Sequence, residues 1–330
     1  MRVWSWIGRF AFVYPAVAFS AIWACAALWF DGPASRMIAG VLAVGFAAAG
    51  LALLITLRPL WKSIAGYLVL FGVVLIWWFS IEPSNQRQWL PEVAQLPRVT
   101  IEGDQVTVEN VRNFEYHSET DFTEHWETRT YDLSQLRGID FFMSYWGSPW
   151  IAHTIVSWDF GDGQHLAISI ETRKEVGEEY SAILGFFRQF ELYYVVADER
   201  DLIGVRTNHR GELVRRYRLK TPPDVARAIL VDYFEEINRL AEQPHWYNAM
   251  TQNCTTTIRH HVQHVAPTNP FNWRILVNGT LDELGYMRGT IDNSLPFEEV
   301  RRRADVTERA KAAGSSADFS TRIRMVAPES

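Results

Sequence analysis

The chain has 330 residues, of which 48% are hydrophobic, and a formal net charge of −6. Five basic residues and one acidic residue precede position 63, so this part carries +4 and the remainder carries −10. Binding to nucleic acid requires a basic surface. The part of the chain after residue 62 is strongly acidic, so nucleic acid is not expected as a partner.

Three apolar runs occupy the N-terminal part of the chain: Phe10–Phe30, Met37–Leu57 and Ile64–Ile81. Each is long enough for a helix to cross a hydrocarbon core about 30 Å thick. A cleavable signal peptide is the alternative for the first run. That run exceeds the roughly 7–15 apolar residues of a signal, and two more runs follow it. We therefore expect residues 1–81 to form a three-span transmembrane anchor.

Basic residues indicate how this anchor is oriented. Arg2 and Arg9 precede the first run, and Arg58 and Lys62 lie between the second and third runs. The positive-inside rule then places the N-terminus in the cytoplasm and everything after Ile81 outside the inner membrane. The runs contain no carboxylate or histidine, which transport pathways carry, so an anchor is favoured over a pump or channel.

The rest of the chain predicts an α+β domain with a mostly antiparallel sheet and packed helices. We expect a linker over residues 82–97, the domain over 98–296, and a charged helix and disordered tail over 297–330. Alternating apolar residues predict a hairpin at Arg98–Phe114 and strands at Phe141–Trp146, Trp150–Asp159, His165–Thr172, Phe190–Val196, Leu202–Arg206 and Leu213–Leu219. Helices are expected at Pro223–Gln243, Thr255–Val265 and Phe297–Ala313.

The chain has two cysteines, and they are not expected to pair. Cys25 lies in the first apolar run, so Cys254 is a free thiol in a compartment that favours disulfides. Asn253 is a good N-cap residue, which places Cys254 in the first turn of a helix. Free amides and the helix dipole lower the pKa of a thiol there. The alternative is a small buried residue at a helix start, and the local pattern leaves both readings open.

A thiol nucleophile needs a base and a group that orients the base. His153 lies on the predicted hairpin that turns at Gly161–Gly163. A three-residue turn there matches the apolar faces of the two strands and places His153 opposite Glu171. We therefore predict His153 as base and Glu171 as its orienting acid. The alternative is a polar pair on a solvated sheet face.

His165 lies on the same hairpin, opposite Asp159 and about 20 Å farther along the strands. Whether Glu171 or His165 orients His153 stays open from the sequence. His260 and His264 are four residues apart and could share a metal, but no Glu or further Cys accompanies them. We expect no metal and no cofactor.

Five ordered motifs resemble the Lnb-type periplasmic domain family, which is named for a bacterial lipoprotein N-acyltransferase. They are Asn110–Tyr116 (NVRNFEY), Tyr145–His153 (YWGSPWIAH), Ser169–Tyr180 (SIETRKEVGEEY), Asp198–Thr207 (DERDLIGVRT) and Tyr247–Thr257 (YNAMTQNCTTT). The resemblance covers roughly Arg98–Val265. The family is regarded as related to permuted papain-like thiol enzymes such as lecithin:retinol acyltransferase, in which the His precedes the Cys. It therefore implies a permuted papain-like domain here.

The resemblance also implies roles for individual residues. Cys254 matches the nucleophile, His153 matches the base, and Glu171 occupies a charged position of the family's SIE-R motif. Arg173, Asp201 and Arg206 also match motif positions. We list Arg173 and Trp146 as candidates for substrate binding, and Gln252 and Asn253 as candidates for stabilising an oxyanion.

The implied function is a membrane-anchored acyltransferase or acyl hydrolase that acts through a thioester on a phospholipid or lipoprotein substrate. Two alternatives stay open. One is a hydrolase of cell-wall peptides or amides with the same Cys-His site, and the other is a non-catalytic module of envelope assembly. The sequence does not indicate the oligomeric state.

Overall fold

The structure is a computed structural model that describes residues 12–267, 270–275 and 277–325. It divides into two compact units. The first contains the chain up to Ser84 together with the segment Tyr180–Phe190, and the second contains Asn85–Glu179 and the chain from Glu191 onward.

Apolar helices form the first unit: α2 (Tyr14–Phe30), α3 (Arg36–Thr56) and α4 (Leu60–Phe79). The helices α3 and α4 are long and apolar enough to cross a membrane. Helix α2 is apolar but has 17 residues, which is shorter than a usual span. The predicted start of the first span, at Phe10, lies outside the described residues. Two of the three predicted spans therefore meet the length criterion.

The segment Tyr180–Phe190 packs against the ends of these helices, although it comes from the middle of the chain. Asp31, between α2 and α3, accepts hydrogen bonds from the backbone N–H of Arg188 (3.1 Å) and the side chain of Gln189 (2.7 Å). The same carboxylate accepts a bond from the indole of Trp78 in α4 (2.7 Å). A polar anchor point therefore joins this segment to the helices.

The second unit contains an eight-stranded sheet in the order β1-β2-β9-β8-β7-β6-β10, with β5 paired to β2. Among the strands that the structure describes, β2 and β9 alone pair in parallel, so the predicted α+β class with a mostly antiparallel sheet is confirmed. The strands are β1 (Arg98–Glu102), β2 (Gln105–Arg112), β5 (Trp126–Asp132), β6 (Gly138–Tyr145), β7 (Ala152–Gly161), β8 (Gln164–Arg173), β9 (Glu191–Ala197) and β10 (Leu213–Arg218); β3 (Glu115–Tyr116) and β4 (Phe122–Thr123) form a separate pair.

The hairpin of β7 and β8 has the predicted register, but its turn differs from the prediction. Ile155 pairs with Ser169 and Asp159 pairs with His165, as expected. Gly161 pairs with Gln164, which leaves a two-residue turn, and a bulge between Asp159 and Gly161 corrects the register. The bulge therefore does what the expected three-residue turn would have done, because both keep the buried faces matched.

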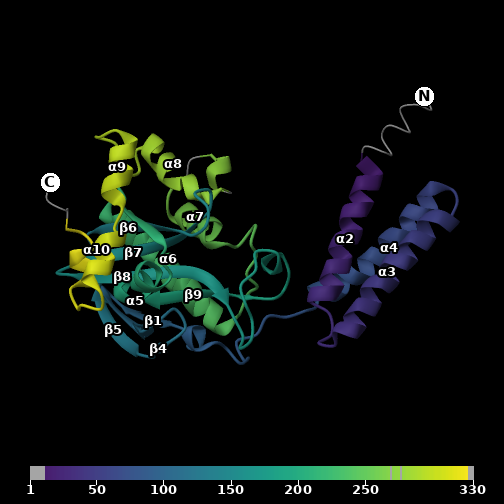
Figure 1. The fold of residues 1–330 in the computed structure, drawn as a ribbon, viewed down its shortest axis with the longest axis horizontal. Helices are drawn as coiled ribbons and strands as arrows, with labels where there is room; N and C mark the ends of the chain where they lie inside the picture. The colour runs from purple at the N-terminus through teal and green to yellow at the C-terminus, as the bar shows by residue number, and fades with distance from the viewer. Residues whose placement is uncertain (1–11, 268–269, 276, 326–330) are drawn as a thin grey trace. The chain divides into compact units, whose positions relative to one another are not determined.

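Helices cover both faces of the sheet (Figure 1). On one face, Trp158 of β7 donates a hydrogen bond to the carbonyl of Ala226 in α6 (Pro223–Glu242; 3.2 Å). On the other face, Ile155 of β7 packs in a cluster with Phe319 of α11 (Phe319–Arg322) and residues of α10 (Thr307–Ala313). The polar positions of the hairpin therefore do not lie on a solvated face.

The C-terminal part is more ordered than predicted. The single helix expected at Phe297–Ala313 is two helices, α9 (Phe297–Ala304) and α10, with a break between them. The stretch expected to be disordered is folded as far as Met325, because Phe319 and Ile323 are buried under the sheet. Both side chains are separated by charged or small residues in the sequence, so the local composition hides their role.

One predicted strand is wrong. Leu202–Arg206 belongs to the short helix α5 (Glu199–Leu202) and the π-helical turn η5 (Val205–His209). The side chain of Asp198 caps α5 by accepting the N–H of Arg200 (2.8 Å). The strand β5 was not predicted, because this edge strand carries charged residues among its apolar ones.

The segment expected as a linker is packed onto the domain from Asn85 onward. The guanidinium of Arg173 donates to the carbonyls of Val93 (3.0 Å) and Ala94 (2.8 Å) and to the side chain of Asn85 (3.0 Å). It also lies 4.2 Å from the ring of Trp89. The connector between the end of α4 and this packed segment is therefore short and consists of residues 80–84.

Candidate active site

Cys254 is the first residue of α7 (Cys254–Val265), as predicted. The side chain of Asn253 accepts the N–H groups of Thr255 (3.0 Å) and Thr256 (2.9 Å), and the hydroxyl of Thr256 accepts the N–H of Asn253 (3.0 Å). This reciprocal capping box fixes the start of the helix. It holds the buried Cys254 thiol at the positive end of the helix dipole.

His153 and Glu171 come together at the open end of the hairpin. The Nε2 of His153 lies 2.6 Å from the Ser169 hydroxyl, which donates to Glu171 Oε1 at 2.8 Å. The direct distance from Nε2 to Oε1 is 3.5 Å. Because the Ser169 proton points to the carboxylate, its oxygen accepts the N–H of Nε2. Nε2 is thus used by Ser169, and Nδ1 is the ring nitrogen that remains for the hydrogen bond with Cys254.

Arg206, in the turn η5, keeps Glu171 ionised. Its Nη2 donates to Glu171 Oε1 at 2.9 Å and its Nη1 donates to the carbonyl of Leu202 at 3.0 Å. Burial would raise the pKa of Glu171, but the charge of Arg206 and the contact with His153 hold it well below its usual range. The carboxylate therefore presents a fixed negative charge to the imidazole.

Cys254 and His153 are hydrogen-bonded to each other, and each shifts the pKa of the other. Burial by itself would lower the pKa of His153, but hydrogen bonds with Cys254 and Glu171 raise it to about 9. Burial would raise the pKa of Cys254, but the hydrogen bond and charge of His153 lower it to about 6. Between these two values the thiol is a thiolate and the imidazole is an imidazolium, which is the arrangement of an activated nucleophile.

Asn278, 24 residues after Cys254, also reaches this site. Its Oδ1 accepts the backbone N–H of Ala152 at 2.9 Å, directly before His153. Its Nδ2 donates to the hydroxyl of Thr255 at 3.0 Å and lies 4.0 Å from the sulfur of Cys254. One side chain thus connects the start of β7 to the start of α7.

An apolar cavity of about 320 Å³ begins beside Cys254 and His153. It touches Thr154 and Thr255, which directly follow His153 and Cys254 in the chain. Its walls are mostly aliphatic and aromatic and include Phe141, Ile258, Val262, Leu281, Leu284 and Ile291. Its size and lining are those of a site for a small apolar group.

The other predicted site residues lie in different settings. Gln252 and Trp146 are exposed. Asn253 uses its amide oxygen for the capping box and its Nδ2 to bond the carbonyl of Ala249 (2.8 Å). The guanidinium of Arg173 bonds the backbone of the segment that precedes β1, not the residues around Cys254. None of these residues gains support from the geometry for its proposed role.

Three residues that contact the site were not predicted to act there. Ser169 opens the motif Ser169–Tyr180 and lies two residues before Glu171, on the same face of β8. Arg206 matches a family motif, but the sequence does not show that it meets Glu171. Asn278 lies beyond α7, in a segment without strong periodicity, and only the fold brings it to the sulfur.

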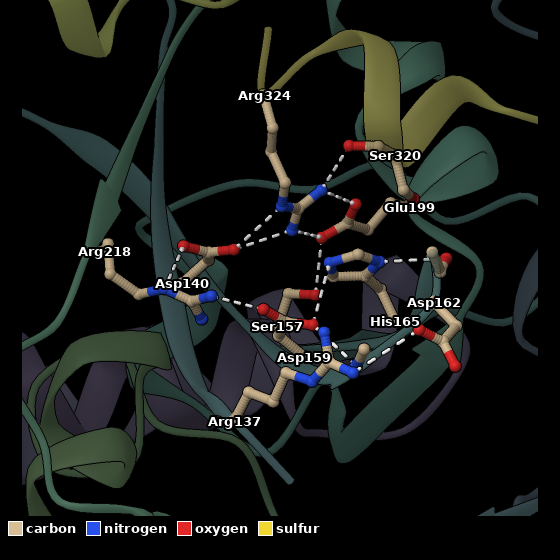
Figure 2. A network of polar contacts seen from close by, with 12 residues as sticks. Arg137, Asp140, Ser157, Asp159, Asp162, His165, Glu199, Arg218, Ser320 and Arg324 are labelled. Atoms are coloured by element: carbon tan, nitrogen blue, oxygen red, sulfur yellow. Dashed lines mark hydrogen bonds and ion pairs between the residues drawn. The ribbon is translucent and has the colours of Figure 1, made fainter. Parts of the chain in front are cut away.

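His165 belongs to a separate network and does not orient His153 (Figure 2). Its Nε2 lies 3.6 Å from Asp159 at the turn end of the hairpin. Arg324 bonds both Asp140 (2.7 Å) and Glu199 (2.6 Å) in this network. The ligand atoms of Asp140, His165 and Glu199 lie within 4.8 Å of one another, but Arg324 takes the position that a cation would need.

The histidines of α7 make contacts of their own. His264 Nδ1 lies 3.1 Å from Asp232, and His261 lies 2.6 Å from the same carboxylate and 2.7 Å from the Tyr194 hydroxyl. His260 packs edge-on against His264. Asp232 of α6 therefore holds the C-terminal half of α7 against α6.

Comparison with known proteins supports the resemblance seen in the motifs. Residues 122–279 match the family model described as the Lnb N-terminal periplasmic domain. This range contains every residue of the site described above, from His153 to Asn278. No curated protein and no solved structure matches the chain. With the apolar N-terminal helices, the match indicates a membrane-anchored protein with a periplasmic domain.

Proposed function

We propose that this chain, which belongs to the Lnb N-terminal periplasmic domain family through residues 122–279, is a membrane-anchored thiol acyltransferase or acyl hydrolase. It acts through a thioester on lipid or lipoprotein substrates of the cell envelope. One observation supports this proposal: Cys254, at the start of α7, is hydrogen-bonded to His153, and Glu171 holds that imidazole through Ser169.

The chemistry follows from the protons in this arrangement. The Cys254 thiolate attacks the carbonyl carbon of an acyl ester, and a carbon–sulfur bond forms while the carbonyl electrons move to oxygen. When the intermediate collapses, the carbon–oxygen bond breaks and His153 gives its Nδ1 proton to the leaving alkoxide. The neutral imidazole then takes a proton from an attacking amine or water, and the carbon–sulfur bond breaks to restore the thiolate.

The surroundings of the site favour an acyl lipid over a cell-wall peptide. The apolar cavity beside Thr154 and Thr255 offers aliphatic walls to a hydrocarbon chain, and the walls of a peptide site would need more polar groups. Large apolar side chains are also exposed on segments that flank the site: Trp146, Trp150, Ile151, Met250 and Trp273. Exposed apolar groups of this kind mark surfaces that meet apolar partners.

The anchor supplies such a substrate at high local concentration. Residues 80–84, which follow α4, span at most about 18 Å when extended. The domain therefore stays near the lipid headgroups, and tethering replaces a search through solution.

The finer topology also belongs to this proposal: three spans with the N-terminus in the cytoplasm. It rests on the basic residues Arg58 and Lys62 between α3 and α4 and on the apolar helix α2. Introduced single cysteines test it, in a chain without Cys25 and Cys254. An impermeant maleimide should label Ser35→Cys in intact cells and Arg58→Cys only after permeabilisation. The opposite pattern would reverse the orientation.

The permuted papain-like fold is the structural side of the proposal. It is supported by the order of His153 before Cys254 and by a thiol at the start of a helix that packs on the sheet beside β7 and β8. A crystal structure of the domain that placed the sulfur away from His153 would contradict both the fold and the chemistry.

Intact-protein mass spectrometry tests the function directly. Full-length protein in phospholipid vesicles should gain the mass of one acyl chain, and hydroxylamine should remove it because thioesters are sensitive to that reagent. Cys254→Ala should gain no acyl mass, and Cys25→Ser should gain the same mass as the wild-type chain. Absence of the adduct, with release of peptides from cell-wall fragments instead, would point to the hydrolase of cell-wall amides.

A further inference from the structure

Acyl transfer places a negative charge on the former carbonyl oxygen, and hydrogen-bond donors must meet it. The backbone N–H of Cys254 is one such donor. It lies in the first turn of α7, where amides have no partner within the helix, and the Asn253 cap takes the N–H groups of the next two residues. Among the described residues, this N–H has no hydrogen-bond acceptor. A second donor, from a side chain, is needed beside it.

We propose that Asn278 is that second donor and that its Nδ2 stabilises the oxyanion formed on Cys254. The inference rests on the proposed function, since it names a further catalytic residue of the same site. Nδ2 lies 4.0 Å from the sulfur, so an oxygen on the carbon bonded to that sulfur comes within hydrogen-bond reach of it. Gln252 is exposed and Asn253 is committed to its cap, so neither supplies this donor.

The amide of Asn278 is held in place before any substrate arrives. Ala152 N–H fixes its oxygen, so the NH₂ group must point toward α7. Its neighbour Gly279 donates to the carbonyl of Trp150 at 3.0 Å. A Cβ on Gly279 would meet the Pro149 carbonyl oxygen at 2.3 Å, so this close approach requires glycine. A donor fixed in this way does not need to reorganise during the reaction.

Asn278 acts at the step in which the sulfur of Cys254 bonds to the carbonyl carbon of the substrate. As the sulfur–carbon bond forms, the carbonyl π electrons become a lone pair on oxygen, which accepts hydrogen bonds from Asn278 Nδ2 and Cys254 N–H. In the resting state Nδ2 donates to Thr255 Oγ1, which can find another donor in solvent or substrate. When the intermediate collapses, the oxygen electrons return to the carbonyl and the leaving group departs with the His153 proton.

Two reactions of the same thiolate separate this role from a structural one. Acylation by a lipid passes through an oxyanion, whereas alkylation by iodoacetamide displaces iodide and forms none. Asn278→Ala should slow acylation of Cys254 by about 10²–10³-fold, as removal of one oxyanion donor does elsewhere. Alkylation at pH 7 should change by less than about threefold if His153 and Cys254 still meet.

Asn238→Ala is the matched control. The side-chain amide of Asn238, on α6, also bonds the backbone: its Oδ1 accepts the N–H of Val99 (2.9 Å) and its Nδ2 donates to the carbonyl of Val99 (2.7 Å). Its loss should leave acylation unchanged. Asn278→Asp keeps an acceptor for the Ala152 N–H but removes the donor, so acylation should stay slow in this variant as well.

The outcomes distinguish the two proposals. If the wild-type chain is not acylated, the proposed function is overturned. Normal acylation of Asn278→Ala would overturn the inference alone. Equal losses of acylation and alkylation would also overturn it, because Asn278 would then only position the pair. Slow acylation with normal alkylation supports it.

Discussion

The two ends of one hairpin carry the same pair of groups and use them differently. At the open end, His153 lies 3.5 Å from Glu171, and at the turn end, His165 lies 3.6 Å from Asp159. Both pairs join β7 to β8, and both are largely shielded from solvent. Pairing a histidine with an acid therefore does not by itself make a base.

The third group at each end makes the difference. At the turn end, Arg324 and Arg218 meet the carboxylates, and arginine is a permanent cation that neither gives nor takes a proton (Figure 2). At the open end, α7 brings the Cys254 thiol to the imidazole, and a thiol can exchange its proton. A residue about a hundred positions away thus decides which histidine can exchange a proton with a thiol.

Exchanging each histidine for alanine gives the sharpest test of this comparison. His153→Ala should slow acylation of Cys254 by about 10³-fold or more, because base and counter-ion are lost together. His165→Ala should change the rate by less than about threefold. Comparable losses in the two variants, measured by mass spectrometry over time, would break the distinction.

The turn-end network should matter for stability instead. Arg324→Ala leaves the buried Asp140 and Glu199 without their shared partner, which costs about 3–5 kcal/mol. For a domain of this size we expect the melting temperature to fall by roughly 10 °C. Tryptophan fluorescence during heating measures this change. Arg322→Ala, which removes an exposed pair with Asp318, is the control and should have almost no effect.

The pH dependence tests the role of Glu171. Reactivity of the pair should rise as pH passes about 6, where Cys254 ionises, and fall above about 9, where His153 loses its proton. Glu171→Gln removes a charge that favours the imidazolium, so the upper limit should move to lower pH. At pH 8.5 we expect acylation to fall about tenfold, and by less at pH 7. A profile that kept its upper limit would show that Glu171 does not act on His153.

The smallest change is expected from Ser169→Ala. The hydroxyl bridges Nε2 and Glu171, but the two groups are already 3.5 Å apart and can meet directly. A single hydrogen bond contributes about 0.5–1.5 kcal/mol, so acylation should slow by at most about tenfold. A loss as large as that of His153→Ala would mean that Ser169 itself takes part in proton transfer.

Local patterns predicted those parts of the molecule that depend on neighbours in sequence or across one turn. Period-two alternation predicted the β7–β8 register and hence the approach of His153 to Glu171, and Asn253 predicted the start of α7. Contacts between residues that are far apart in the sequence were not predictable in this way. Arg206 reaches Glu171 from a turn whose sequence looks like a strand, and Asn278 reaches Cys254 from beyond α7.

The same limit explains the C-terminal stretch. Phe319, Ile323 and Arg324 lie in a sequence rich in small and charged residues, which is typical of disorder. Their order comes from contacts with residues far away: the cluster under the sheet receives Phe319, and Arg324 meets Asp140. Disorder predicted from composition fails where a few spaced residues fit a preformed surface.

The segment Tyr180–Phe190 has a consequence for how this protein can be divided. It leaves the periplasmic domain between β8 and β9 and joins the helices through Asp31, and it carries the exposed Ile183 and Phe186. Removing residues 1–81 would therefore remove the helices that this apolar segment contacts. Anyone who produces the domain as a secreted fragment must shorten or redesign that loop, and a foreign anchor cannot simply be exchanged for the native one.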